Sequence, residues 1–192
     1  MKSNRKADHP IHPLILNRWS PRAMTGEPIS DEALNSLFEA ARWAPSSYNA
    51  QPWRILYAKN TSHHFAVFMD LMVEFNQSWA KKAAVLGLFI ARKTFEHNNK
   101  PAPTHAYDTG AAWENLALEG SSRDLVVHGM QGFDYDKARA KLNIPPEYEV
   151  LAMFAVGVPA PKESLPPELQ QKEIPSGRKK IEEFAMEGPF RK

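Results

Sequence analysis

One uninterrupted apolar run, Val85 to Ala91, constrains the fold of this chain more than any other segment. It is far shorter than the ~18 apolar residues that a membrane-crossing helix needs, and no other run in the chain approaches that length. A short continuous apolar run is typical of a strand buried on both faces of a sheet. We therefore expect a central strand here, with helices around the sheet that contains it.

The clearest helix is predicted over Ser30 to Ala44, where apolar residues recur at helical spacing: Leu34, Leu37, Phe38 and Ala41. Ser30 is a good N-cap residue, and Pro45 ends the helix. Further helices are expected over residues 63–80, 107–120 and 134–142, and further strands over 54–58, 125–128 and 150–156. The sequence thus predicts a mixture of helices and strands around one central sheet.

With 192 residues the chain can build one sizeable core, so we expect a single domain over residues 1–192. From Pro159 to Pro175 the chain is rich in proline and polar residues, and such a segment is expected to run extended rather than build a core. Two alternatives remain for the C-terminal arm, residues 159–192: a loose tail, or an arm laid across a partner subunit. The second would bury the apolar residues that follow: Ile181, Phe184, Met186 and Phe190.

Composition excludes several classes of function. A net charge of +2 does not indicate a nucleic-acid-binding protein, and the basic clusters at 2–22 and 178–180 suffice for one or two phosphates only. The absence of cysteine excludes disulfides, thiolate chemistry and cysteine-ligated metals, and it fits a cytoplasmic location. Met1 to Pro10 lack the apolar core of a signal peptide.

Several familiar site motifs are missing as well. The chain contains neither a GxGxxG turn nor a phosphate-binding P-loop. It has no HExxH pair, so we expect no metal site, and no GxSxG, so we expect no hydrolase nucleophile.

The stretch Ala44 to Arg54 is crowded with hydrogen-bonding side chains: Ser46, Ser47, Asn49 and Gln51. Pro45 and Pro52 restrict the backbone around them. One interpretation is an ordinary connection with Trp53 in the core. The other, which explains the amide and hydroxyl groups, is a loop that grips a flat ligand with polar edges.

Three further motifs could bind a ligand. In Arg18-Trp19-Ser20-Pro21-Arg22, two guanidinium groups can converge on one phosphate, although such residues are often a solvated face. In His128 to Phe133, two glycines allow unusual backbone angles and close approach to a ligand; the alternative is a simple glycine-rich turn. The basic cluster Ser176 to Lys180 by itself would be a solubilising segment.

In their order along the chain, RWSPR, PSSYNAQPW, HGMQGFD and GRKK-IEEF resemble motifs of the nitroreductase family of FMN-dependent oxidoreductases. The resemblance extends from about Ile15 to Phe184. It implies an α+β fold of three layers, α/β/α, with a mainly antiparallel central sheet and an extended C-terminal arm. It also implies a homodimer with two FMN molecules at the subunit interface.

The resemblance assigns roles to individual residues. The first motif and the C-terminal arginine are expected to bind the FMN phosphate: Arg18, Trp19, Ser20, Arg22 and Arg178. A loop that often comes from the other subunit of the dimer is expected to line the flavin ring and ribityl chain: Pro45, Ser46, Ser47 and Asn49. The isoalloxazine and its N5 edge are expected to be contacted by Gly129, Met130, Gln131 and Gly132. Asn76 resembles the residue that meets the pyrimidine edge, Lys81 and Lys82 could face N1, and Tyr48 is bulkier than the small residue often found beside the substrate.

The implied activity is hydride transfer from NAD(P)H through flavin N5 to an electron-poor acceptor, such as a nitroaromatic or a quinone, by a ping-pong mechanism. Such chemistry needs no protein nucleophile, which fits the missing motifs. Two alternatives stay open: an FMN-binding carrier or sensor without turnover, and a flavin-dependent dehydrogenase or dehalogenase of a specific metabolite. The expected partners are a second subunit and a small-molecule acceptor, not nucleic acid or membrane.

Overall fold

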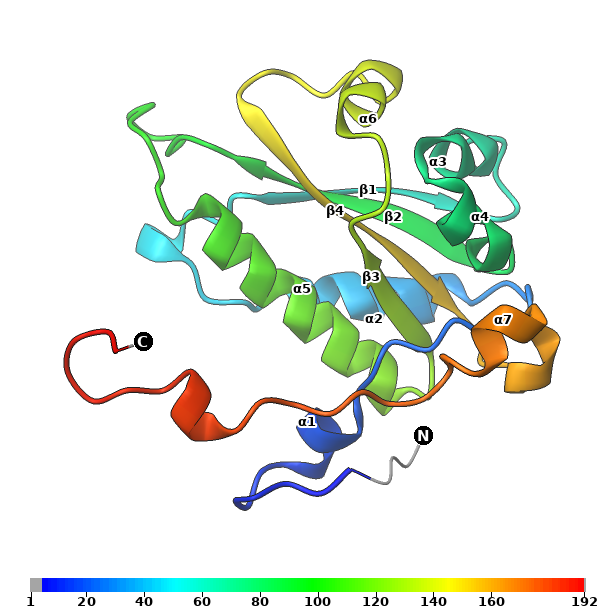
Figure 1. Ribbon diagram of the computed structural model, residues 1–192. Helices are drawn as coiled ribbons and strands as arrows, with labels where there is room; N and C mark the ends of the chain where they lie inside the picture. The colour runs from blue at the N-terminus through cyan, green and yellow to red at the C-terminus, as the bar shows by residue number, and fades with distance from the viewer. Residues whose placement is uncertain (1–4, 192) are drawn as a thin grey trace.

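A four-stranded sheet in the order β1-β2-β4-β3 forms the centre of the computed structural model, which describes residues 5–191 (Figure 1). Every pairing in this sheet is antiparallel. Its strands are β1 (Trp53–Lys59), β2 (Val85–Arg92), β3 (Val126–Met130) and β4 (Tyr148–Gly157). Because β2 is hydrogen-bonded to β1 on one side and to β4 on the other, the predicted central strand is confirmed, as is the antiparallel sheet.

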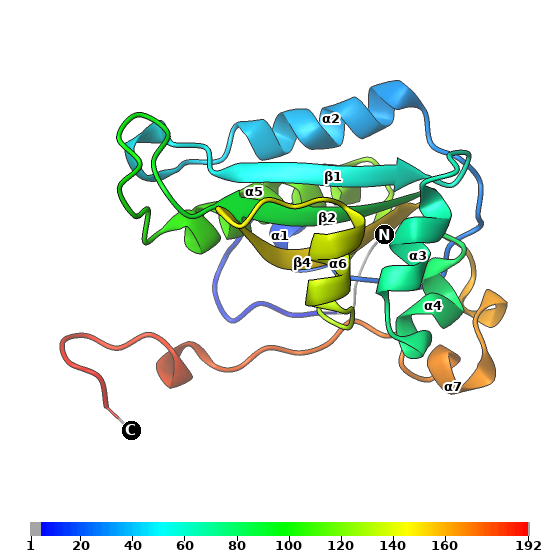
Figure 2. The same cartoon turned by 90° about the horizontal axis from the view of Figure 1, so that it is seen from above.

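Helices cover both faces of the sheet (Figures 1 and 2). On one face lie α2 (Asp31–Arg42) and α5 (His105–Ser122), and on the other α3 (Phe65–Leu71), α4 (Glu74–Ala80) and α6 (Tyr135–Lys141). Successive side chains of β2 point to opposite faces, so Val85 and Phe89 pack with α2 and α5, whereas Leu86 and Leu88 pack with α3 and α4. The predicted three-layer α/β/α arrangement is confirmed.

Helix α2 begins as the sequence predicts. The Ser30 hydroxyl accepts a hydrogen bond from the amide of Ala33 at 3.1 Å, which satisfies one of the free donors of the first turn. Leu34, Leu37 and Ala41 form its buried stripe. Within residues 5–191, no helix has the length and apolar character that crossing a bilayer requires.

The single helix predicted over 63–80 is wrong in one respect, because the chain breaks between α3 and α4. Met72 and Val73 adopt extended backbone angles there. Met72 forms a β-bridge with Phe133, and the amide of Val73 donates to the carbonyl of Gly132 at 3.1 Å. This pairing with a distant turn overrides the local helical period, and it brings α4 next to that turn.

The C-terminal arm is extended only in part. A short helix, α7 (Pro167–Gln170), interrupts the expected extended segment, and Leu165 and Leu169 are buried in the core of the same chain. Beyond α7 the chain, which began with the short helix α1 (Pro13–Asn17), runs away from the body of the molecule (Figures 1 and 2). Its apolar side chains there are largely exposed, up to 80% for Phe190.

Candidate functional site

Residues far apart in the sequence meet in a cavity of about 270 Å³, which we call the basic cleft. The first predicted motif lines it with Arg18, Trp19, Ser20 and Arg22. Arg178 of the C-terminal arm lines it as well, so the structure brings the predicted phosphate residues together. Five more residues, none of them predicted to bind the phosphate, complete the lining: Arg5, His128, Lys172, Ile174 and Ser176.

Arg22 is held at the cleft by a buried carboxylate. Glu173, whose side chain is only 4% exposed, accepts hydrogen bonds from the backbone amides of Arg22 at 2.6 Å and Ala23 at 2.9 Å. Its second oxygen lies 3.7 Å from Nη1 of Arg22. Nε of Arg22 is buried and has no hydrogen-bond partner within residues 5–191. Glu173 therefore fixes the position of Arg22 and offsets its charge, but leaves one donor unsatisfied.

The other two predicted arginines differ in their partners. Nε of Arg18 pairs with Glu114 at 3.2 Å. Nη1 of Arg178 donates to its own loop, to Oγ of Ser176 at 3.1 Å and to the carbonyl of Gly177 at 2.9 Å. Among residues 5–191, no carboxylate lies within ion-pair distance of Arg178. The cleft therefore keeps an excess of positive charge.

His128 adds no charge to the cleft. Its Nδ1 is 2.9 Å from the carbonyl of Pro21, and its ring lies against Trp79 with centroids 4.6 Å apart. Burial, aided by repulsion from Arg22, lowers the pKa of His128 to about 4. The imidazole is thus neutral near pH 7, so Nδ1 carries a proton when it donates to Pro21 and anchors the arginine motif.

A second cavity, of about 340 Å³, adjoins the basic cleft and shares Arg18 and Ser20 with it. Gly129, Met130 and Gln131, at the end of β3, line this cavity, and their predicted contact with an isoalloxazine stays a prediction. Trp113 of α5 lines it too, although the sequence analysis did not assign it to the site. The two cavities together offer a charged compartment beside a less polar one.

The glycines of this turn have a different role from the one expected. Neither Gly129 nor Gly132 adopts a positive φ, so unusual backbone angles are not the reason for them. A Cβ at Gly129 would lie 2.9 Å from the ring of Trp113, and one at Gly132 would lie 2.7 Å from Nδ2 of Asn76. Both positions therefore need glycine for close packing.

Asn76 supports the turn from α4. Its Nδ2 donates to the carbonyl of Gly132 at 3.0 Å, and its side chain is nearly buried. Asn76 and Gly132 border the second cavity's turn without lining either cavity, and the exposed Lys81 and Lys82 line neither. The predicted contact of Asn76 or these lysines with a flavin stays a prediction.

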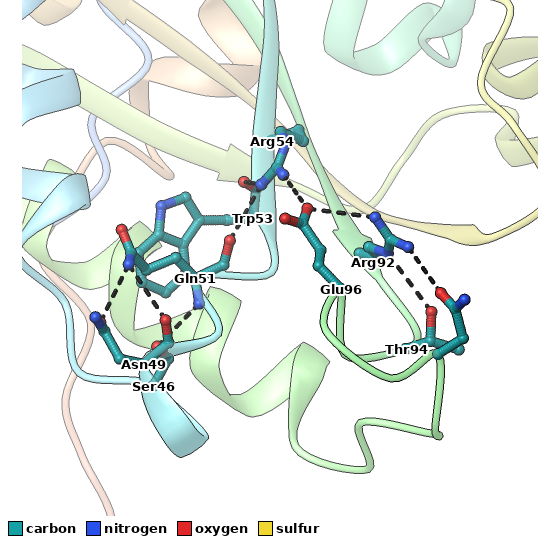
Figure 3. A network of polar contacts seen from close by, with 9 residues as sticks. Ser46, Asn49, Gln51, Trp53, Arg54, Arg92, Thr94 and Glu96 are labelled. Carbon is teal, nitrogen blue, oxygen red and sulfur yellow. Dashed lines mark hydrogen bonds and ion pairs between the residues drawn. The ribbon is translucent and has the colours of Figure 1, made fainter.

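The loop from Pro45 to Arg54 lies outside both cavities of its own protomer. Its backbone is unusual, since Tyr48, Asn49 and Gln51 all have positive φ, at 52°, 52° and 46°. Each such residue costs about 1–3 kcal/mol and persists only where the surroundings impose it. Here Oγ of Ser46 accepts from the amide of Gln51 at 3.0 Å (Figure 3), and Asp108 accepts from the amide of Ser47 at 3.1 Å.

A polar network joins this loop to the connection after β2 (Figure 3). Glu96 pairs with Arg54 at 2.7 Å and with Arg92 at 3.3 Å. Trp53 is buried in the core, so its structural role is confirmed, whereas Tyr48 is 88% exposed. Hydrogen bonds thus hold the backbone of the loop, while the ring of Tyr48 points into solvent.

A family model described as the nitroreductase family matches residues 15–66 and 59–158. A solved structure described as an oxidoreductase containing FMN is 41% identical, with a TM-score of 0.94, and the match covers 98% of this chain and 97% of that one. A protein of Desulfovibrio desulfuricans solved in complex with FMN is 24% identical, with a TM-score of 0.73, over 96% of this chain and 100% of that one. A Thermus thermophilus protein named NADH dehydrogenase is 27% identical over 76% of this chain and 84% of its own length.

Proposed function

The chain belongs to the nitroreductase family, and on this premise we propose that it is an oxidoreductase that binds FMN and uses NAD(P)H to reduce an electron-poor small molecule such as a nitroaromatic or a quinone. The FMN named for two of its structural relatives and the NADH dehydrogenase name of its Thermus relative support this proposal. The most important support from the chain itself is the basic cleft beside the second cavity.

The cleft fits a phosphomonoester. Arg178 has no carboxylate partner among the described residues, and Nε of Arg22 is a buried donor without an acceptor. A phosphate group carries a charge of about −1.5 to −2 and several strong acceptor oxygens, so it matches both the charge and the free donors. We assign the phosphate to Arg18, Ser20, Arg22 and Arg178, with Trp19 in the same wall.

The adjoining cavity fits a flat ring system. Trp113 and the turn from Gly129 to Gln131 line it, and the close packing of Gly129 on Trp113 holds this wall in one position. When bound, FMN would supply the hydride-transferring centre. The residues of the chain bind and orient the cofactor there, and Trp113 and Met130 exclude water from one side of the cavity.

The remaining predicted residues belong, in this proposal, to the site of a partner subunit. Pro45, Ser46, Ser47 and Asn49 line neither cavity of their own protomer, yet their loop is held rigidly toward the outside. The exposed apolar residues of the C-terminal arm, among them Phe184 and Phe190, also lack cover in the monomer. A homodimer in which the arm crosses the partner would bring the loop to the partner's site and would bury the apolar residues of the arm.

The proposal is tested by the visible spectrum of the purified protein. A flavin spectrum that bleaches anaerobically on addition of NADH or NADPH, and returns with a quinone, would support it. A flavin spectrum that neither nucleotide bleaches would favour the carrier or sensor alternative. Protein that takes up no FMN on reconstitution would contradict the proposal altogether.

The phosphate assignment has its own test. The double variant Arg18→Ala, Arg178→Ala should be isolated largely free of flavin, because it loses two of the cationic groups of the cleft. The control, Lys141→Ala with Lys162→Ala, removes two exposed cations outside both cavities and should keep its flavin. Full FMN occupancy in the arginine variant would show that the assignment is wrong.

A further inference from the structure

Arg5 lies at the basic cleft although it precedes every motif that the sequence pointed to. Its Nη1 donates to the carbonyl of Arg18 at 2.8 Å and to that of Leu16 at 3.4 Å. These two bonds fix the planar guanidinium against the backbone that carries Arg18. The side chain is partly buried, and its Nε is a buried donor with no hydrogen-bond partner within the described chain.

The charges around Arg5 are unbalanced. Burial and the nearby guanidinium groups of Arg178 and Arg18 all lower the pKa of Arg5. Two carboxylates next to the cleft pair with other arginines, Glu114 with Arg18 and Glu173 with Arg22, and neither pairs with Arg5. Three guanidinium groups that repel one another around a cavity are stabilised when an anion enters it.

We propose that Arg5 is an additional ligand of the phosphate group that enters the basic cleft, acting together with Arg18 and Arg178. The inference rests on the proposed function insofar as FMN brings that phosphate. A guanidinium anchored by one nitrogen presents its remaining donors in a fixed direction, which suits the oxygens of a phosphomonoester. Arg5 therefore contributes to the discrimination between FMN and riboflavin, which has the same ring system but no phosphate.

The test measures dissociation constants of FMN and riboflavin for the flavin-free protein, by the change in flavin fluorescence. A charge-assisted hydrogen bond is worth about 1.5–3 kcal/mol, so Arg5→Ala should weaken FMN binding roughly 10- to 150-fold. Riboflavin binding should change less than about twofold, because riboflavin makes no use of the phosphate contacts. The neighbouring Lys6, which is exposed and lines neither cavity, supplies the control variant Lys6→Ala, with unchanged affinity for both ligands.

Two conservative variants separate phosphate binding from mere support of the Arg18 backbone. Arg5→Lys keeps the positive charge and should recover most of the FMN affinity. Arg5→Gln keeps a polar amide but has no charge and a shorter reach, and it should remain as weak as Arg5→Ala. If Gln restores FMN binding as well as Lys does, or if Arg5→Ala weakens riboflavin as much as FMN, the proposal is wrong.

Inorganic phosphate alone distinguishes a failure of this inference from a failure of the proposed function. Millimolar phosphate should raise the unfolding temperature of the flavin-free wild type more than that of Arg5→Ala, with chloride at equal ionic strength as reference. If the wild type binds neither flavin, the proposed function fails, but this difference would still support Arg5 as a phosphate ligand. Equal stabilisation of both proteins by phosphate would overturn the inference.

Discussion

The ring of Tyr48 meets the ring of Phe95 edge-on, with centroids 5.7 Å apart and planes at 87°. The contact joins the loop from Pro45 to Arg54 with the connection that follows β2, the same two segments that the ion pair of Glu96 with Arg54 links (Figure 3). Tyr48 is almost fully exposed, and Phe95 packs against one edge of its ring. An exposed aromatic ring beside a binding site can limit the shape of what binds there.

If the loop of Tyr48 borders the substrate site of the partner subunit, Tyr48→Ala should widen that site. We expect kcat/KM for a bulky polycyclic quinone to rise about tenfold, while that for a small quinone changes little, in line with the modest energies of apolar pocket contacts. Steady-state assays with both acceptors test this. The control Tyr57→Ala removes a half-exposed tyrosine from β1 and should leave the ratio of the two kcat/KM values unchanged. An unchanged ratio in Tyr48→Ala would contradict the prediction.

Gly129→Ala should disturb both the fold and the second cavity. The added Cβ would approach the ring of Trp113 to 2.9 Å, and overpacking of this kind costs about 1–3 kcal/mol of unfolding free energy. The control is Gly110→Ala in α5, where a Cβ meets nothing within 4 Å and helix propensity should add about 0.5–1 kcal/mol. The midpoint of urea unfolding should be lower than that of the wild type for Gly129→Ala and higher for Gly110→Ala. Equal midpoints would show that the Trp113 ring moves aside at no cost.

His128 should make the stability of the flavin-free protein depend on pH. Its pKa is about 4 in the folded protein, below the ordinary value of 6.5, so the unfolded chain binds more protons between these values. Stability is therefore full above about pH 6.5 and is lost as the pH falls toward 4, with about 2 kcal/mol of the loss between pH 7 and 5. Urea unfolding at pH 7 and at pH 5 measures this loss of unfolding free energy. The loss should be about 2 kcal/mol smaller in His128→Asn than in the wild type. The control His97→Asn, at an exposed position, should lose as much as the wild type.

Glu173→Gln should destabilise the protein, because it leaves Arg22 without a charge partner and weakens the hydrogen bonds to two backbone amides. Hydrogen bonds that involve a charged group are worth about 1.5–3 kcal/mol, and we expect a loss of this size in unfolding free energy. Glu168→Gln, at an exposed position of α7, is the matched control. A loss no larger than that of the control would mean that Glu173 contributes little to the fold.

Local patterns predicted the elements whose causes are local. The apolar run from Val85 to Ala91 and the capped stripe of Leu34, Leu37 and Ala41 needed no knowledge of distant residues. The break at Met72 and Val73 could not be predicted in this way, because it depends on pairing with Gly132 and Phe133. Strand direction likewise came from the family resemblance and not from periodicity.

The residues of the candidate site likewise differ in whether a local sequence pattern marks them. The arginine motif and the turn after His128 have recognisable local sequences, and the structure brings Arg18 and Gly129 to adjoining cavities. Arg5 lay inside a basic cluster that gave no reason to prefer one cation over another. Glu173 could not be found at all, since its partner Arg22 is 151 positions away and no local pattern marks such a contact.

The tie between Arg22 and Glu173 also sets an order of events during protein synthesis. The first arginine motif is translated before Glu173 and Arg178, which are among the latest of the residues that line or brace the cleft. A nascent chain therefore has no complete phosphate cleft, however much of the sheet has already formed. In the proposed site, the full set of phosphate contacts therefore forms only after all four strands of the sheet, the last of which ends at Gly157, have been synthesised.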